Sequence, residues 1–231
     1  MARHALVVGG ARGIGRGITA ALLDDGFAVT IAGRTSRAPE LEAAGATWQR
    51  LDASDPEQVA AVVGAIDPVD VLVVCAGPYH RVPLMRETPQ GWRSMLANNL
   101  DCVFYLAQAV LPGMRERGWG RILTFSMAGA EHLKGNPMVT AHYIAKVGVL
   151  VLTRTLARAG AKAGVTANCI SPGFIDSGSA PAEELEQMVK TIPAARIGTV
   201  DEVVGTARFL VSEEAGYING ANIVVSGAWG I

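Results

Sequence analysis

A glycine-rich run between residues 9 and 15 has the residue types and spacing of a phosphate-binding turn. It lies between an apolar run at residues 5–8 and a stretch of helical period at residues 16–24, and it reads Gly9-Gly10-Ala11-Arg12-Gly13-Ile14-Gly15. Backbone N–H groups at a helix N-terminus bind a pyrophosphate, because the helix dipole favours negative charge there and glycines allow close approach. A tight turn without a ligand requires fewer spaced glycines. We therefore expect a dinucleotide to bind through Gly9, Arg12, Gly13, Ile14 and Gly15.

An arginine follows the second apolar run, residues 28–32. In dinucleotide-binding folds an acid near this point holds the 2′-hydroxyl of the adenosine ribose, whereas an arginine accommodates a 2′-phosphate. The sequence carries Arg34 and no acid here, and Arg12 is a second cation that can reach the same phosphate. A lone arginine is often a solvated surface residue, but the missing acid and the bidentate fit of guanidinium to phosphate favour a ligand. The predicted cofactor is NADP(H).

Short apolar runs rich in β-branched residues alternate with longer stretches of helical period. The runs are residues 5–8, 28–32, 69–74, 121–125, 165–170 and 222–225. This alternation is typical of repeated βαβ units, and strands that are apolar on both faces indicate helices on both sides of a parallel sheet. We expect an α/β fold, a doubly wound Rossmann-type sheet in three layers, with residues 1–231 forming a single domain. Residues 77–120, which have room for two helices, and the irregular stretch 172–196 are the expected walls of the substrate site.

The composition excludes several classes of partner. Half of the 231 residues are hydrophobic, 18% are charged and the formal net charge is −1, without basic runs that would attract nucleic acid or anionic lipid. No segment reaches the roughly 18 apolar residues that span a bilayer. The three cysteines are expected to be reduced thiols, and the histidines lack a metal-ligand spacing. We expect a cytoplasmic protein that acts on a small molecule and holds no metal.

Further motifs follow the glycine run in a fixed order. They are Asp52-Ala53, Ala76-Gly77, Asn99-Leu100, Lys146-Val147-Gly148-Val149 and Ser171-Pro172-Gly173. Together they resemble the short-chain dehydrogenase/reductase superfamily, particularly its 3-oxoacyl-carrier-protein-reductase-like members, over essentially the whole chain. The resemblance implies a homotetramer or homodimer. It also implies further cofactor-binding residues, which are Asp52, Ala53, Ala76, Gly77, Lys146, Pro172, Gly173, Ile175 and Ser177.

The chemistry that this resemblance implies is hydride transfer between a nicotinamide and a carbonyl or alcohol carbon. In the family a serine and a tyrosine bind the reacting oxygen, a lysine contacts the ribose and an asparagine holds a proton relay. Lys146 and Asn99 match the last two. The tyrosine precedes the lysine by four residues in the family, but His142 stands there and Tyr143 is only three residues before Lys146. On a regular helix Tyr143 points about 100° away, so either residue remains a candidate proton donor, Tyr143 only with a local bulge.

The serine position departs from the family pattern as well. Met127 stands where the serine is usual and Ser126 lies one residue early, so Ser126 can serve only if the strand has already ended. Val74-Cys75 also replaces two asparagines. The first hypothesis is an NADP(H)-dependent oxidoreductase of a ketone or alcohol that uses Lys146, Asn99, Ser126 and either His142 or Tyr143. The alternatives are a redox-neutral enzyme, such as a cyclase, dehydratase or isomerase, and a non-catalytic nucleotide-binding protein.

Overall fold

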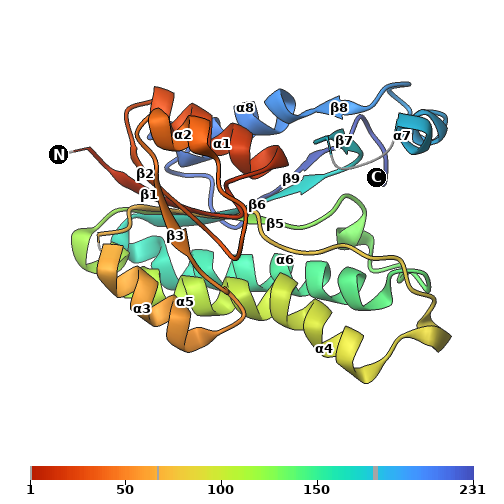
Figure 1. Ribbon diagram of the computed structural model, residues 1–231, viewed down its shortest axis with the longest axis horizontal. Helices are drawn as coiled ribbons and strands as arrows, with labels where there is room; N and C mark the ends of the chain where they lie inside the picture. The colour runs from red at the N-terminus through yellow and green to blue at the C-terminus, as the bar shows by residue number, and fades with distance from the viewer. Residues whose placement is uncertain (1, 67, 179–181) are drawn as a thin grey trace.

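A seven-stranded parallel sheet forms the centre of the molecule (Figure 1). The computed structural model describes residues 2–66, 68–178 and 182–231. The strand order is β3-β2-β1-β4-β5-β6-β9, so the chain first winds outward to one edge and then crosses over to build the other half. The strands are β1 (His4–Val8), β2 (Ala28–Gly33), β3 (Thr47–Arg50), β4 (Val71–Val74), β5 (Gly120–Phe125), β6 (Val165–Pro172) and β9 (Asn222–Val225). The predicted doubly wound α/β fold is confirmed.

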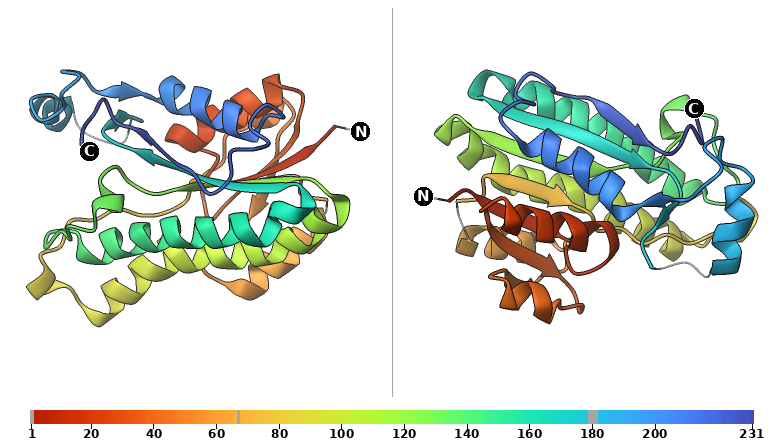
Figure 2. Two further views of the ribbon diagram at one scale, coloured as in Figure 1. Left: turned by 180° about the vertical axis from the view of Figure 1, so that it is seen from behind. Right: turned by 90° about the horizontal axis from the view of Figure 1, so that it is seen from above.

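Helices cover both faces of the sheet (Figures 1 and 2). One face carries α1 (Gly13–Asp24), α2 (Pro39–Ala43) and α8 (Val200–Val211). The other carries α3 (Pro56–Ile66), α4 (Pro89–Leu96), α5 (Cys102–Arg117) and α6 (Thr140–Gly160). Strand β4 shows why the central strands are apolar throughout, because Leu72 and Val74 pack into the core on the α5 face and Val71 and Val73 into the core on the α1 face.

Three strands lie outside the apolar runs of the sequence. Strand β3 is at the edge of the sheet and has a largely exposed surface, so it carries no apolar signal. Strands β7 (Ile175–Asp176) and β8 (Gly198–Thr199) form a separate two-stranded sheet. The segment expected to be irregular thus contains β7 and also helix α7 (Ala182–Val189), which spans only eight residues.

The segment between β4 and β5 holds the two expected helices, α4 and α5, joined by a π-helical turn at Ala97–Asp101. A π-turn inserts an extra residue into a helix and is frequent at functional sites. Asn99 lies in this turn and is buried. The remaining short helical turns are Leu84–Arg86, Ala130–His132 and Ala161–Ala163. None of the helices in the described ranges is long and apolar enough to cross a bilayer.

Candidate active site

The glycine-rich run makes the turn from β1 into α1. Helix α1 begins at Gly13, and Gly9 has a φ of 82°, a conformation that residues with a Cβ rarely adopt. A Cβ on Gly9 would come within 2.8 Å of the backbone nitrogen of Ala76, at the end of the neighbouring strand β4. The turn therefore lies directly against the chain after β4, and the first N–H groups of α1 are left without intrahelical partners.

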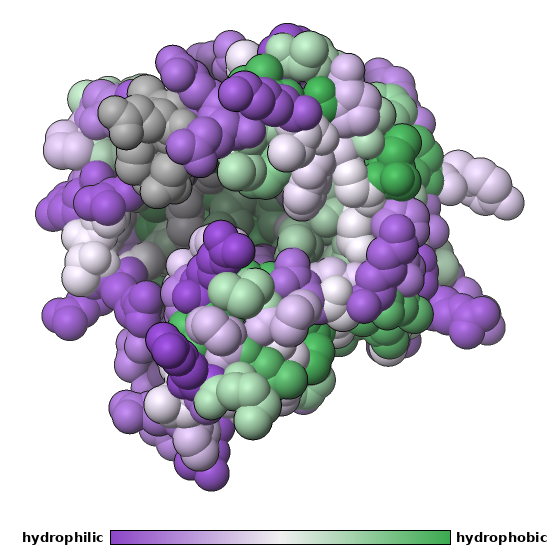
Figure 3. Space-filling model, turned by 90° about the vertical axis from the view of Figure 1, so that its right-hand side faces the viewer, coloured by the Kyte–Doolittle hydropathy of each residue, from purple (hydrophilic) through white to green (hydrophobic). Residues whose placement is uncertain are grey.

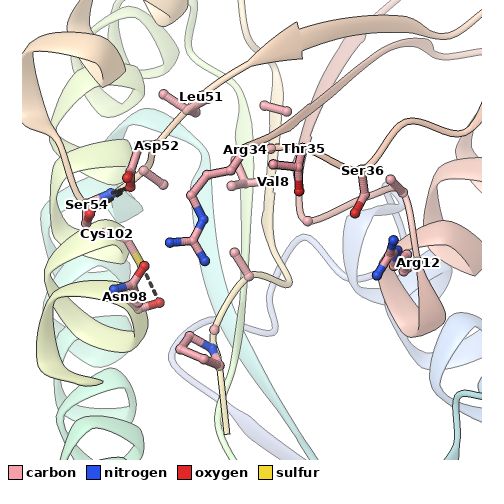
Figure 4. Close-up of a pocket in the computed structure, with 18 residues that line it drawn as sticks. Val8, Arg12, Arg34, Thr35, Ser36, Leu51, Asp52, Ser54, Asn98 and Cys102 are labelled. Carbon is pink, nitrogen blue, oxygen red and sulfur yellow. Dashed lines mark hydrogen bonds between the residues drawn. The ribbon is translucent and has the colours of Figure 1, made fainter. Parts of the chain in front are cut away.

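A cavity of about 420 Å³ opens beside this turn (Figure 4). It is lined by seven of the residues predicted to bind the cofactor, namely Gly9, Arg12, Arg34, Asp52, Ala53, Ala76 and Gly77. In Figure 4 the guanidinium of Arg34 extends into the cavity, whereas that of Arg12 lies on the far side, next to Ser36. The two cations thus flank the segment that follows β2, rather than converging on one point. Thr35, Ser36 and Asn98 also line the cavity, although they were not predicted from the sequence. Thr35 and Ser36 could have been predicted because they directly follow Arg34.

The carboxylate of Asp52 is held as an anion at the edge of the cavity. Its Oδ1 accepts hydrogen bonds from the backbone nitrogen (3.0 Å) and the hydroxyl (2.7 Å) of Ser54. These bonds, assisted by the charge of Arg34, hold the pKa of Asp52 below its ordinary value. A carboxylate in this state can accept a hydrogen bond from a ligand and cannot donate one.

Lys146 is buried where α6 passes the end of β5. Its Nζ donates to the carbonyl oxygen of Phe125 at 3.0 Å, and burial lowers the pKa of the ammonium group. Burial also raises the pKa of Cys75 to about 12 and that of Cys102 to about 11, so these thiols stay neutral and do not compensate the charge of Lys146. The Nζ of Lys146 has further hydrogen-bond donors besides the one that Phe125 accepts, so it has donor capacity left for a ligand.

Asn99 presents an unused acceptor near Lys146. Its Nδ2 donates to the carbonyl oxygens of Pro78 and Met95, both at 3.1 Å, whereas its buried Oδ1 has no hydrogen-bond partner among the described residues. A Cβ built on Gly77 would collide with this Oδ1 and lie 3.4 Å from Nζ of Lys146. The structure therefore brings Asn99, Gly77 and Lys146 together, and a buried orphan acceptor beside an ammonium group suits the proton-relay role that the resemblance implies.

His142 and Tyr143 lie on different sides of the regular helix α6. His142 packs edge-on against the ring of Tyr79, with ring centroids 5.1 Å apart, and its buried Nδ1 has no partner among the described residues. Burial, and then the charge of Lys146, lower the pKa of His142 to about 4, so the imidazole is neutral at physiological pH. The hydroxyl of Tyr143 donates to the carbonyl oxygen of Gly129 at 3.1 Å, away from His142.

The serine candidate also has its hydroxyl engaged. Ser126 follows directly after β5, so the strand has ended as its role required, but its Oγ donates to the carbonyl oxygen of Lys146 at 2.8 Å. The next residue, Met127, packs against the core on the α5 face. Both hydroxyls that the sequence offered near α6, those of Ser126 and Tyr143, thus hold backbone carbonyls in this structure.

The residues predicted on the nicotinamide side follow the end of β6. The nitrogen of Gly173 donates to Val225 at 2.9 Å, and a Cβ on Gly173 would meet Ser226 at 2.8 Å, which fixes this segment against the C-terminal strand. Ile14 and Ile175 pack into the core on the α1 face. The carbonyl oxygen of Pro172 accepts a hydrogen bond from the backbone nitrogen of Ala128 at 3.0 Å. Ser177 lies against Gly13, since a Cβ there would be 3.2 Å from the serine Cβ. Ser177 therefore packs against the end of the glycine turn at which α1 begins.

Known proteins are similar to this chain in sequence and in fold. A family model described as enoyl-(acyl carrier protein) reductase matches residues 9–229. The acetoacetyl-CoA reductase of Rhizobium meliloti is 36% identical over 238 residues, which cover 98% of each chain. The chain belongs to the short-chain dehydrogenase/reductase family. The 3-oxoacyl-[acyl-carrier-protein] reductase MabA of Mycobacterium tuberculosis is 37% identical over 239 residues, covering 100% of this chain and 94% of that protein.

Solved structures agree with the family assignment. A short chain dehydrogenase from Bacillus anthracis superposes with a TM-score of 0.89 at 28% identity, covering 99% of this chain and 97% of the other. A putative gluconate dehydrogenase from Agrobacterium tumefaciens gives 0.88 at 27% identity, with coverage of 97% and 94%. The protein is therefore an enzyme of the short-chain dehydrogenase/reductase family, a family of oxidoreductases whose reductases use nicotinamide cofactors.

Proposed function

We propose that this short-chain dehydrogenase/reductase uses NADP(H) to reduce a ketone, or to oxidise the corresponding alcohol, of a small organic substrate. The observation that carries the proposal is the cavity beside the glycine turn, which has Arg34 at the end of β2 where an acid would hold a ribose 2′-hydroxyl. Arg34 serves the 2′-phosphate, with Arg12 and Ser36 at the other side of the same segment. The N-terminus of α1 binds the pyrophosphate, and Asp52 and Ala53 bound the adenine side.

The nicotinamide, when bound, supplies or accepts a hydride. Lys146 holds the ribose next to it through the donors that Phe125 leaves unused. The free Oδ1 of Asn99 accepts from the proton relay behind Gly77. Pro172, Gly173, Ile175 and Ser177 close the site from the β6 side. In this arrangement the family's lysine and asparagine keep their roles, whereas the proton donor must be a group other than a tyrosine at position 142.

The substrate class to test first is a 3-oxoacyl thioester. The relatives named above are reductases of acetoacetyl-CoA and of 3-oxoacyl groups on acyl carrier protein. The space-filling view shows a hollow in the face that carries the C-terminus, with hydrophobic side chains on its floor (Figure 3). A hollow of this character suits the apolar part of an acyl chain.

A redox-neutral reaction is the second candidate. It is favoured by the two replacements, His142 for tyrosine and Met127 for serine, which together remove both hydroxyls that the family uses to bind a reacting oxygen. The two functions are separated by following NADPH oxidation with acetoacetyl-CoA and with a panel of ketones and quinones. Turnover of NADPH supports the reductase, whereas tight NADPH binding without turnover of any compound supports the redox-neutral enzyme.

We also propose that the enzyme is a homodimer or homotetramer. The outer faces of α5 and α6 expose Phe104, Ile144 and Val151, each with about half of its surface accessible. Apolar residues gathered on adjacent helices favour association with a second copy. Sedimentation equilibrium of the wild type and of Val151→Asp tests this proposal. We expect a smaller molecular mass for the variant than for the wild type, and equal masses would contradict the proposal.

A further inference from the structure

The site lacks a proton donor at the place where the family carries one. The imidazole of His142 is neutral, has a buried Nδ1 and is shorter than a phenol. The hydroxyls of Tyr143 and Ser126 each donate to a backbone carbonyl, at 3.1 Å and 2.8 Å. A ketone reductase nevertheless requires an acid within hydrogen-bond reach of the carbonyl oxygen. Among the described residues the question becomes which other hydroxyl lies next to His142.

Tyr79 meets this requirement. Its ring contacts that of His142 edge-on, with centroids 5.1 Å apart and an interplanar angle of 88°, and 63% of the tyrosine surface is accessible. Edge-to-face aromatic pairs of this separation are favourable by about 0.5–1.5 kcal/mol beyond the area that they bury. Tyr79 is therefore held at one edge by the residue that replaces the usual tyrosine, with the rest of its ring open to a ligand.

The backbone before Tyr79 is tied to the relay. The carbonyl oxygen of Pro78 accepts from Nδ2 of Asn99 at 3.1 Å, and Gly77 packs directly against Oδ1 of the same side chain. Gly77 and Pro78 also line the cofactor cavity, and Tyr79 is the next residue along the chain. The loop after β4, rather than helix α6, thus places a phenol beside His142, one residue after the backbone that Asn99 and the cavity share.

Building on the proposed function, we infer that Tyr79 is the proton donor of the reaction and that His142 is the residue that positions it. In the reducing direction the carbonyl carbon gains a hydrogen with both electrons from the reduced nicotinamide, while the carbonyl oxygen takes the proton of the Tyr79 hydroxyl. The C–H bond of the dinucleotide and the O–H bond of Tyr79 break, and the C–H and O–H bonds of the alcohol form. The phenolate then regains a proton from solvent, to which Tyr79 is exposed.

The test uses Tyr79→Phe, which removes the hydroxyl and keeps the ring contact with His142. The matched control is Tyr217→Phe, because Tyr217 is a fully exposed tyrosine and is distant in sequence from Tyr79 and His142. With the ketone that turns over fastest, we expect Tyr79→Phe to lower kcat at least about 100-fold, as the loss of a general acid does, without changing the Kd of NADPH. Calorimetry of the product alcohol in the NADP⁺ complex should show about five- to tenfold weaker binding in Tyr79→Phe, because one hydrogen bond is lost.

The positioning role of His142 has its own readout. We expect His142→Phe, which keeps an aromatic edge against Tyr79, to retain at least about tenfold more turnover than His142→Ala. The inference is overturned if Tyr79→Phe stays within about threefold of the wild type, or if His142→Phe is as inactive as His142→Ala. If none of the tested ketones supports oxidation of NADPH by the wild type, both the proposed function and this inference are wrong. If the wild type and Tyr79→Phe are both active, only the inference is wrong.

Discussion

Replacing Arg34 with aspartate is expected to reverse the dinucleotide preference. Arg34 follows β2, extends into the cavity and approaches Asp52 closely enough to lower the pKa of that carboxyl group. A charge-assisted hydrogen bond contributes about 1.5–3 kcal/mol, but Arg34 is exposed and solvent screens part of this. We therefore assign about 1–2 kcal/mol to its contact with a 2′-phosphate.

The expected changes in affinity follow from these values. Arg34→Ala should weaken NADPH binding about five- to thirtyfold. Arg34→Asp adds repulsion between two negative charges, worth about 1 kcal/mol for a pair fully exposed to water, which brings the loss to about 30- to 150-fold. The new carboxylate can accept from the ribose 2′-hydroxyl of NADH, a bond worth about 0.5–1.5 kcal/mol. NADH should therefore bind about two- to tenfold more tightly than it binds the wild type.

The assay is calorimetric titration of both dinucleotides into the wild type, the two Arg34 variants and Arg37→Ala. Arg37 is a fitting control because it pairs with Glu42 and does not line the cavity. Raising the ionic strength should shrink the wild-type preference for NADPH, since exposed charges are screened. The role of Arg34 would be refuted if the ratio of the NADPH and NADH dissociation constants in Arg34→Asp stays within about twofold of the wild-type ratio.

The other predictions concern the turn, the helix and the histidine. Gly9→Ala should abolish NADPH binding in calorimetry, since its Cβ would press on Ala76 at 2.8 Å and φ is 82°. Tyr143→Phe should lower the free energy of unfolding by about 1 kcal/mol in urea, because the hydrogen bond from the hydroxyl to the Gly129 carbonyl is lost, and should lower kcat far less than Tyr79→Phe does. The folded-state pKa of His142, about 4, lies below its ordinary value of about 6.5, so its contribution to stability is complete above pH ~6.5 and is lost as the pH falls toward 4. Between pH ~6.5 and 4 the free energy of unfolding of the wild type should therefore fall by on the order of 3 kcal/mol because of His142, and in His142→Gln this fall should be absent. The same pH dependence in the variant and the wild type would contradict the lowered pKa of His142.

The sequence was informative where a feature is local or periodic. The buried strands and the turn at Gly9 follow from apolar runs and glycine spacing, whereas β3 escaped the apolar pattern because an edge strand buries little of its surface. The regular helix over Thr140–Gly160 also fits the expectation that His142 and Tyr143 point in different directions.

Contacts between distant segments were beyond the reach of the sequence. The hydroxyl of Ser126 binds the carbonyl of Lys146, twenty residues away, and no local pattern announces this pairing. The contact of Tyr79 with His142 likewise joins the loop after β4 to helix α6. From sequence alone Tyr79 is one of several aromatic residues that either pack or line a pocket.

Binding of NADPH at the glycine turn is tested by calorimetric titration of the dinucleotide into the purified wild-type protein. We expect one site per chain, with NADPH bound at least about tenfold more tightly than NADH. Absence of binding for both dinucleotides, or a tighter complex with NADH, would contradict it.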